Sequence, residues 1–129
     1  MRALIGLDDG VLSRFVEEAL KRKGFAFLRG KGSNVTEYEV TSPHRFLVTV
    51  ENTTREKIWF PFRGARVESA LEVKRKIGAN EPDDQLRQCV AEFLNTLCGS
   101  MPSETWHMFR IAGPGAETGD WRDLWPSNQ

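Results

Sequence analysis

The chain has 129 residues, and 18 lysines and arginines balance 18 aspartates and glutamates, so the formal net charge is zero. An apolar fraction of 40%, with eight phenylalanines and four tryptophans, is enough for the packed core of one domain. No run of about 18 apolar residues is present, which excludes a membrane-spanning helix, and the first ten residues lack the apolar stretch of a secretory signal. We therefore expect a cytoplasmic protein.

The first strong pattern predicts a helix over residues 8–24. Asp8 or Asp9 is placed to accept the unpaired backbone N–H groups of its first turn. Apolar residues recur at helical spacing through residues 11–20, which predicts that this stripe packs on a sheet. Three cations at positions 21–23 suit the negative end of the helix dipole, and Gly24 ends the helix.

Residues 24–63 predict an antiparallel sheet, because four short runs of period-two alternation are separated by turn residues. The turns are expected at 30–34, 42–45 and 52–54. Pro61 cannot donate a ladder hydrogen bond, so the last run is an edge strand or its end. Glu37, Glu39 and Thr49 are expected on the solvent face. The buried face takes the alternating apolar set Phe25, Phe27, Thr36, Tyr38, Val40, Phe46, Val48, Val50, Ile58, Phe60 and Phe62.

Two later segments have helical patterns. Residues 65–77 fit a helix and a strand about equally, and the Lys74–Gly78 ending favours the helix. Pro82 fits the first turn of another helix, where Asp83 and Asp84 lie near its positive end. A regular apolar stripe follows, and Gly99 is expected to stop this helix.

The C-terminal part alternates again over residues 106–111, which suggests a late strand before the Gly113–Gly115 break. Residues 1–112 are therefore expected to form one α+β domain, an antiparallel sheet of four to five strands with two to three helices packed on one face. Residues 113–129 form a tail that either docks on the domain or binds a partner. The tail residues expected to contact a partner are Trp121, Asp123, Leu124 and Trp125.

Few residues are candidates for a catalytic, metal-binding or cofactor-binding site. Cys89 and Cys98 fall in one predicted helix, about 13 Å apart along its axis, which is beyond disulfide reach and favours a reducing compartment. The two cysteines and two histidines have no zinc spacing, and no phosphate loop or other cofactor motif is present. His44, in a predicted turn beside Arg45, is the one candidate general base, but no nucleophile is assigned to it.

Charge is divided unevenly along the chain. Residues 1–80 hold 15 basic and 10 acidic residues, a balance of +5, and residues 81–129 hold 3 and 8, a balance of −5. Such a molecule either meets a partner by charge complementarity or carries ordinary solvated faces. Basic residues interleaved with aromatics also suggest phosphate contacts, although the pI of about 6.7 is far from a basic signature. The nucleic-acid candidates are Arg29, Lys31, Ser33, Asn34 and Arg45, with Arg55, Lys57, Arg63 and Arg66 following them.

One resemblance covers roughly residues 8–78. The order helix, strand, glycine turn, strand, strand and helix, together with the segments 16–25, 28–34 and 45–50, resembles HicA-type toxins, which are small bacterial mRNA interferases with a double-stranded-RNA-binding-like fold. Lys31, Gly32 and Ser33 match that family's turn, but Asn34 stands where its catalytic histidine lies. Because an amide cannot shuttle protons as an imidazole does, the resemblance implies a catalytically dead or repurposed scaffold.

The sequence favours a small non-catalytic binding protein of bacterial or phage origin that acts through another protein, as an inhibitor, antitoxin or immunity-type factor. The absence of a catalytic motif, the uneven charge and the Trp-bearing tail motivate this expectation. The alternative is an RNA- or DNA-interacting module on the HicA-like scaffold. A third hypothesis, an enzyme that uses His44, names no substrate.

Overall fold

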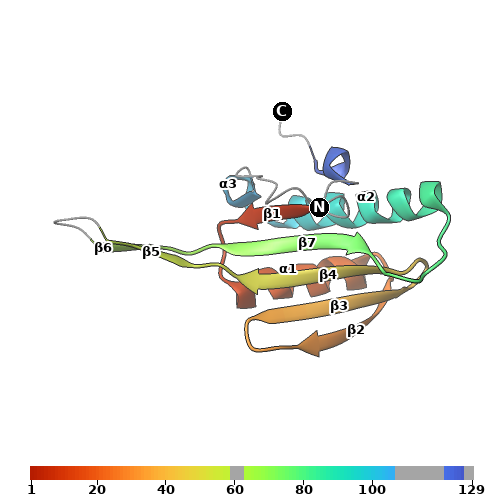
Figure 1. Cartoon of the computed structure of the whole chain (residues 1–129). Coiled ribbons are helices and arrows are strands. Elements are labelled where there is room, and N and C mark those ends of the chain that lie inside the picture. Colours follow the sequence, from red (N-terminus) through yellow and green to blue (C-terminus); the bar gives the residue numbers. More distant parts are fainter. Residues whose placement is uncertain (59–62, 107–120, 127–129) are drawn as a thin grey trace.

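The computed structural model describes residues 1–58, 63–106 and 121–126, and for residues 55–58 and 63–66 it describes the backbone alone. Its largest element is a five-stranded sheet in the order β1-β7-β4-β3-β2, in which every neighbouring pair is antiparallel. The strands are β1 (Arg2–Ile5), β2 (Ala26–Lys31), β3 (Val35–Ser42), β4 (Phe46–Asn52) and β7 (Ser69–Arg75). The sheet confirms the predicted α+β class, with two main helices on one face (Figure 1).

Helix α1 (Asp9–Arg22) joins β1 to β2. Its N-terminus forms as predicted, because Asp8 Oδ1 accepts a hydrogen bond from the Val11 backbone N at 2.9 Å. At its other end Gly24 has a φ of +74°, a left-handed conformation that glycine adopts without a Cβ penalty. The buried stripe of α1, which includes Leu12 and Val16, packs into the core.

Helix α2 (Asp83–Ser100) follows β7 and lies beside α1 on the same face of the sheet. Pro82 occupies its N-cap position, and the helix continues through Gly99 to Ser100, one residue beyond the predicted stop. Two short helices complete the described chain: α3 (Ser103–Trp106) and the 3-10 turn η1 (Arg122–Leu124). No helix of the described residues is both long enough and apolar enough to cross a bilayer.

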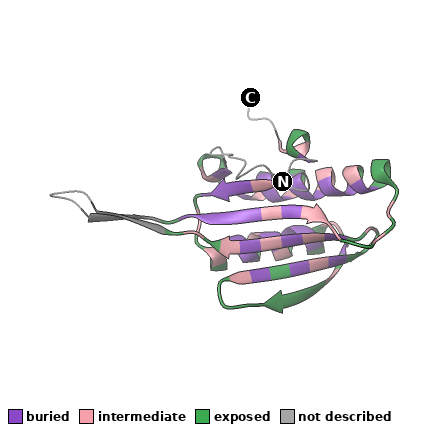
Figure 2. Cartoon of the chain, viewed as in Figure 1, coloured by how far each residue is buried: buried purple, intermediate pink, exposed green. Residues whose placement is uncertain are grey.

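The core lies between the helices and the face of the sheet that alternation predicted. Tyr38, Val48 and Val73 are fully buried in three neighbouring strands. Figure 2 shows that buried segments recur along β3, β4 and β7. Phe46 meets Phe25 edge-to-face at a centroid distance of 6.4 Å and Phe93 of α2 at 6.1 Å, so it joins sheet and helix.

The opposite face of the sheet is charged, as the sequence predicted for Glu37 and Glu39. The register aligns Glu37, Thr49, Glu72 and Arg2 in one row across four strands. Ion pairs run along this face, from Arg2 to Glu51 at 3.8 Å, from Lys74 to Glu72 at 3.3 Å and from Lys76 to Glu39. These pairs lie at the surface with partly exposed side chains, where an ion pair contributes little to stability.

Two expectations are corrected. Residues 65–77 are not a helix, because they include the end of β6 (Arg63–Arg66) and all of β7, which lies between β1 and β4. The strand alternative, left open by the pattern, is the correct one. Residue 106 ends a short helix rather than beginning a strand, and residues 107–111 of the predicted late strand lie outside the described residues. The segment Arg2–Ile5, for which the sequence pattern predicted no element, is the edge strand β1.

Beyond the main sheet, the chain forms a second two-stranded ribbon. β5 (Arg55–Ile58) continues from β4, and β6 continues into β7, so the pair extends the middle of the sheet as an arm that projects from the body (Figure 1). The last predicted strand run lies here, with Ile58 in β5 and residues 59–62 outside the described part of the chain. We call β5 and β6 together the arm.

Candidate nucleic-acid interface

The predicted nucleic-acid residues lie at two opposite ends of the sheet. Val35 pairs with Glu51 at one end of the β3–β4 ladder, and Val40 pairs with Phe46 at the other. The turn that carries Lys31, Ser33 and Asn34 is therefore at the end from which the arm projects, whereas Arg45 is at the far end. An eight-residue strand such as β3 spans roughly 26 Å, so one flat contact cannot use both groups at close range.

The turn at residues 31–35 is fixed against the base of the arm. The backbone N of Gly32 donates to Val35 O at 2.7 Å, which closes the turn. The backbone N of Asn52, the last residue of β4, donates to Asn34 O at 3.3 Å. Lys31, Ser33 and Asn34 are all exposed. Their ammonium, hydroxyl and amide groups therefore face solvent beside the arm.

Arg29 has a structural contact as well. It lies on the outer strand β2 with its side chain about half exposed at 49%, and its Nη1 is 3.9 Å from Glu17 Oε1 on α1. The hydroxyl of buried Tyr38 donates to Glu17 Oε2 at 3.1 Å. Burial raises the pKa of Tyr38, and the neighbouring Glu17 carboxylate raises it further. The Arg29–Glu17–Tyr38 chain therefore ties the edge strand to α1.

The base of the arm is continuous with the sheet. Asn52 pairs with Ser69, the backbone N of Thr53 donates to Glu68 O at 2.9 Å, and Arg55 pairs with Arg66. The side-chain Oδ1 of Asn52 accepts from the Thr54 backbone N at 2.8 Å, a local turn that marks the junction of β4 and β5. The break expected at 52–54 is present, but the strand resumes after it in the same ribbon, which the local pattern does not predict.

The register of the arm sorts its charges onto faces. Arg55 pairs with Arg66, Glu56 with Ala65, Lys57 with Gly64 and Ile58 with Arg63. Paired residues share a face of an antiparallel ribbon, and successive residues alternate. One face therefore carries Arg55, Lys57 and Arg66 and no acidic residue, and the other carries Glu56 and Arg63. The i, i+2 spacing of Arg55 and Lys57 was the available sequence signal for this basic face.

His44 meets a carboxylate at the far end of the sheet. Its Nδ1 lies 2.9 Å from Glu81 Oε2, and Glu81 Oε1 accepts from the Arg45 backbone N at 3.0 Å. The hydrogen bond from His44, followed by that from Arg45, lowers the pKa of Glu81. This carboxylate joins the β3–β4 turn to the segment that leads into α2. No local pattern predicts this pair, because Arg45 and Glu81 are 36 positions apart in the chain.

Cys89, the cysteine near His44, is not a nucleophile at neutral pH. Cys89 is buried on α2, and burial, with the charges of Glu92 and Glu81, raises the pKa of its thiol to about 11. Burial raises the pKa of the Cys98 thiol to about 12. Both cysteines are free, as predicted, and at neutral pH both are protonated thiols rather than nucleophilic thiolates. Among the described residues no group of three or more His, Cys, Asp or Glu could hold a metal ion.

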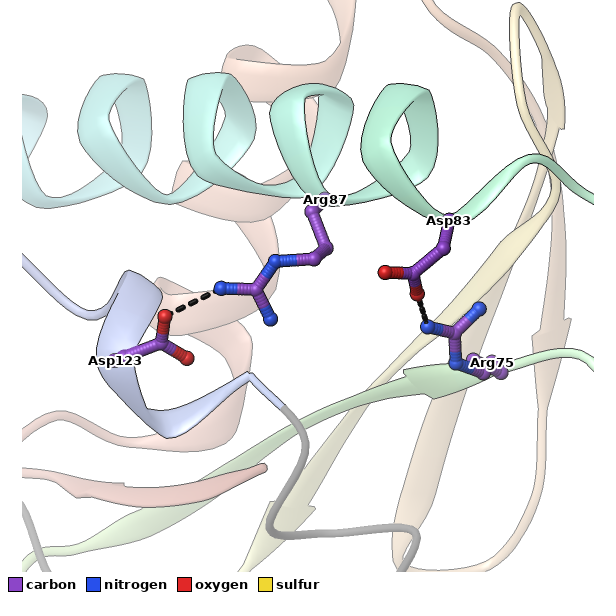
Figure 3. Close-up of polar contacts among 4 residues, drawn as sticks. All are labelled: Arg75, Asp83, Arg87 and Asp123. Carbon is purple, nitrogen blue, oxygen red and sulfur yellow. Dashed lines mark hydrogen bonds and ion pairs between the residues drawn. The ribbon is translucent and has the colours of Figure 1, made fainter.

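The described part of the tail, residues 121–126, lies against the domain. Trp121 is 1% exposed within the core, and Arg75 lies over its ring at 5.4 Å from the centroid. Asp123 forms an ion pair with Arg87 of α2, near the Arg75–Asp83 pair at the start of that helix (Figure 3). Trp125 packs edge-to-face on Trp106 at 6.2 Å, and Leu124 is partly buried against the core. A partner contact by these residues stays a prediction.

Comparisons of the chain with protein-family models, curated proteins and solved structures found no match. The resemblance to HicA-type toxins therefore stays an expectation from the sequence.

Proposed function

We propose that this protein is a non-catalytic binding protein that contacts nucleic acid with the arm and the adjoining 31–35 turn. The observation that carries the proposal is the register of the projecting ribbon, which puts Arg55, Lys57 and Arg66 on one face. A row of Arg and Lys on an extended element is suited to binding phosphate groups. The basic side chains neutralise the phosphate charge and need no preformed pocket to do so.

Local charge supports this proposal although the whole chain is neutral. Residues 55–66 contain four cations and one anion, a balance of +3, so the remaining residues carry −3. A polyanion is attracted by the field close to the arm and is repelled by the acidic body, which favours contact at the arm alone. The pI of the whole chain argues against nucleic-acid binding, but it does not reflect this separation between a basic arm and an acidic body.

The 31–35 turn adds donors at the same end of the sheet. Lys31, Ser33 and Asn34 are exposed, and the turn is hydrogen-bonded to the end of β4. Ammonium, hydroxyl and amide donors of this kind position a protein on a phosphate backbone. Arg45 and His44, at the other end, are not part of the proposed surface.

The test is an anisotropy titration of labelled mixed-sequence nucleic acid at about 50 mM salt, where phosphate contacts are strongest. The Arg55→Glu/Lys57→Glu double variant should bind at least about tenfold more weakly than the parent and show a smaller salt slope. The matched control is Lys21→Glu/Arg45→Glu, which changes net charge equally at exposed positions away from the arm. It should keep most of the affinity. Equal losses in the two variants, or a flat parent titration, would contradict the proposal.

A second candidate, binding to another protein, is favoured by the outer strand β2. Among the described strands β2 pairs with β3 alone, and Leu28 on it is 63% exposed, so its outer edge offers an apolar side chain and backbone groups to an added strand. An inhibitor or antitoxin role would use such an edge. A host protein captured by the parent and lost with Leu28→Lys, but retained by Glu37→Lys, would support this candidate. Identical captures by all three would remove it.

A further inference from the structure

We infer that the outer edge of β2 pairs with β2 of a second copy of this chain, in an antiparallel register centred on Leu28. This occupant lies beyond the proposed function, because the arm is not part of the β2 edge. The exposure of the strand, the direction of its backbone groups and the placement of its side chains all point to it.

The outer edge of β2 is open. Its residues are exposed except Phe27, which is partly buried against the core, and the strand contains no proline. Its apolar side chain Leu28 is 63% exposed. The opposite edge of the sheet differs, because α3 lies against β1 and the backbone N of Gly6 donates to Thr105 O at 2.8 Å. An open edge of this kind is a template for a further strand.

The hydrogen bonds of the β2–β3 hairpin fix which backbone groups of β2 point outward. The backbone N of Gly32 donates to Val35 O at 2.7 Å, so these two residues form a hydrogen-bonded pair. Hydrogen-bonded and non-hydrogen-bonded pairs alternate along an antiparallel ladder. Leu28 therefore directs its backbone groups to β3, whereas Phe27 and Arg29 direct theirs to the free edge.

A twofold axis through Leu28 matches this alternation. Phe27 of each copy then forms a hydrogen-bonded pair with Arg29 of the other copy, which satisfies the outward backbone groups of both residues. Leu28 meets Leu28 of the second copy in a non-hydrogen-bonded pair, where side chains approach most closely. The two exposed leucines would cover each other.

This register also keeps like charges apart. It sets Arg29 opposite the aromatic ring of Phe27 of the second copy, and an aromatic ring attracts a cation. An axis through Arg29 would oppose two arginines and leave Leu28 without an apolar partner. An axis through Phe27 would pair Arg29 with Phe25, whose backbone N already donates to Leu20 O at 2.9 Å. The axis through Leu28 avoids both conflicts.

Sedimentation equilibrium of the full chain over a range of concentrations measures the association. Two short edges form a small contact, so we expect a monomer–dimer equilibrium with a Kd on the order of 10–100 µM. Leu28→Lys would oppose two ammonium groups across the axis and should raise the Kd at least about tenfold. The matched control is Thr49→Lys, which adds the same charge to the same face of the sheet, between Glu37 and Glu72. It should leave the Kd within about twofold of the parent value.

Cysteine substitution tests the register. Residues in a non-hydrogen-bonded pair have Cα atoms about 4.5 Å apart, which is within disulfide range. Leu28→Cys should give a covalent dimer with oxidised glutathione, which is reduced as two thiols become one disulfide. The matched control is Gly30→Cys on the same face, where a Cβ meets nothing within 4 Å. In this register the two copies of residue 30 are about 14 Å apart along the strands, so they should not cross-link. The natural thiols of Cys89 and Cys98 are buried.

The expected result is a concentration-dependent dimer that Leu28→Lys weakens and that Leu28→Cys, but not Gly30→Cys, makes covalent. A parent that stays monomeric up to about 500 µM would overturn the inference and leave the edge to a different protein, as in the second candidate function. A dimer that Leu28→Lys does not weaken, or cross-linking of Gly30→Cys in preference to Leu28→Cys, would also overturn it. None of these results would change the proposal for the arm, which the anisotropy titration tests separately.

Discussion

Glu81 shows how one side chain can join distant parts of the chain. Both of its oxygens are engaged at the β3–β4 turn, one by the His44 ring and one by the Arg45 backbone N. The carboxylate and the imidazole are each largely buried, with side-chain exposures of 17% and 19%. An imidazole paired with a carboxylate invites a catalytic interpretation, but the thiol of the neighbouring Cys89 is protonated at neutral pH. Its hydrogen bonds make the pair a contact between the β3–β4 turn and the segment that leads into α2.

This role makes a pH-dependent prediction for Glu81→Gln. The pKa of Glu81 is lowered in the folded protein from its ordinary value of 4.5, so its contribution to stability is present above that value and is lost as the pH falls through the lower folded pKa. At neutral pH the substitution should lower the free energy of unfolding by about 1 kcal/mol, the net contribution of a hydrogen bond of this kind. Below the folded pKa the difference should shrink towards zero, as measured by urea unfolding at each pH.

Glu37→Gln is the matched control, because Glu37 is an exposed carboxylate on the charged sheet face. It should leave unfolding nearly unchanged at both pH values. A deficit for Glu81→Gln that stays the same in acid would show that the charge of Glu81 does not provide the contact.

Burial of individual side chains was the most predictable property at this scale. Tyr38, Val40, Phe46 and Val48 are buried as period-two alternation required, because a strand exposes its two faces in turn. The partner of a buried polar group was not predictable in the same way. Tyr38 donates to Glu17 of α1, a contact that depends on how the helix lies across the sheet.

At the scale of elements, the helix predicted for residues 65–77 was wrong because a local sequence pattern does not contain the pairing between strands. Ser69–Arg75 is β7, which forms ladders with both β1 and β4 and is buried at Leu71 and Val73. Leu71 and Val73 do alternate with Glu72 and Lys74, but Val67, Ala70, Leu71 and Ile77 also fit a helical spacing, so the local pattern did not decide between the two. Strand β1 was missed because four residues give too short a pattern.

The tail is the second element that the sequence left open. Trp121 lies in the core, and the ion pair of Asp123 with Arg87 fixes η1 to α2. The two interactions differ in weight. Burying an indole removes a large apolar area from water, whereas an exposed ion pair contributes at most about 1 kcal/mol.

Substitution of Trp121 should therefore show that the tail contributes to the fold. Trp121→Ala should lower the free energy of unfolding by about 3–5 kcal/mol, the range for truncating a large buried aromatic ring. Asp123→Asn should lower it by less than about 1 kcal/mol. Chemical denaturation of both variants measures the contrast. A Trp121→Ala protein as stable as the parent would contradict the packing of this ring in the core.

At the scale of the whole molecule, the separation of charge along the sequence was predicted, but its distribution in space was not. Along the sequence, residues 1–80 are basic and residues 81–129 are acidic. In the fold, four cations lie together on the projecting arm, whereas others, such as Arg2, Lys23 and Arg29, form ion pairs within the body. Arg29 and Arg45 were grouped with Lys31 as nucleic-acid candidates, but the fold separates them. Arg29 is paired with Glu17 of α1, and Arg45 lies at the far end of the sheet.

The arm itself could not be predicted, for a physical reason. The alternating run that includes Ile58 predicted a strand here, but a local pattern gives neither its continuity with β4 nor its pairing with β6. What defines the arm is the continuity of β4 with β5 and of β6 with β7, and that continuity is a property of long-range pairing.

The central claim is that the arm is the part of this molecule that contacts nucleic acid. Backbone amide chemical shifts, followed by NMR as duplex DNA is added to the intact protein, test it most directly. The account predicts that the largest changes occur at residues 55–58 and 63–66, with smaller ones at 31–35 and almost none at the 42–46 turn. Changes centred on the 42–46 turn or on α2, with the arm unaffected, would contradict it.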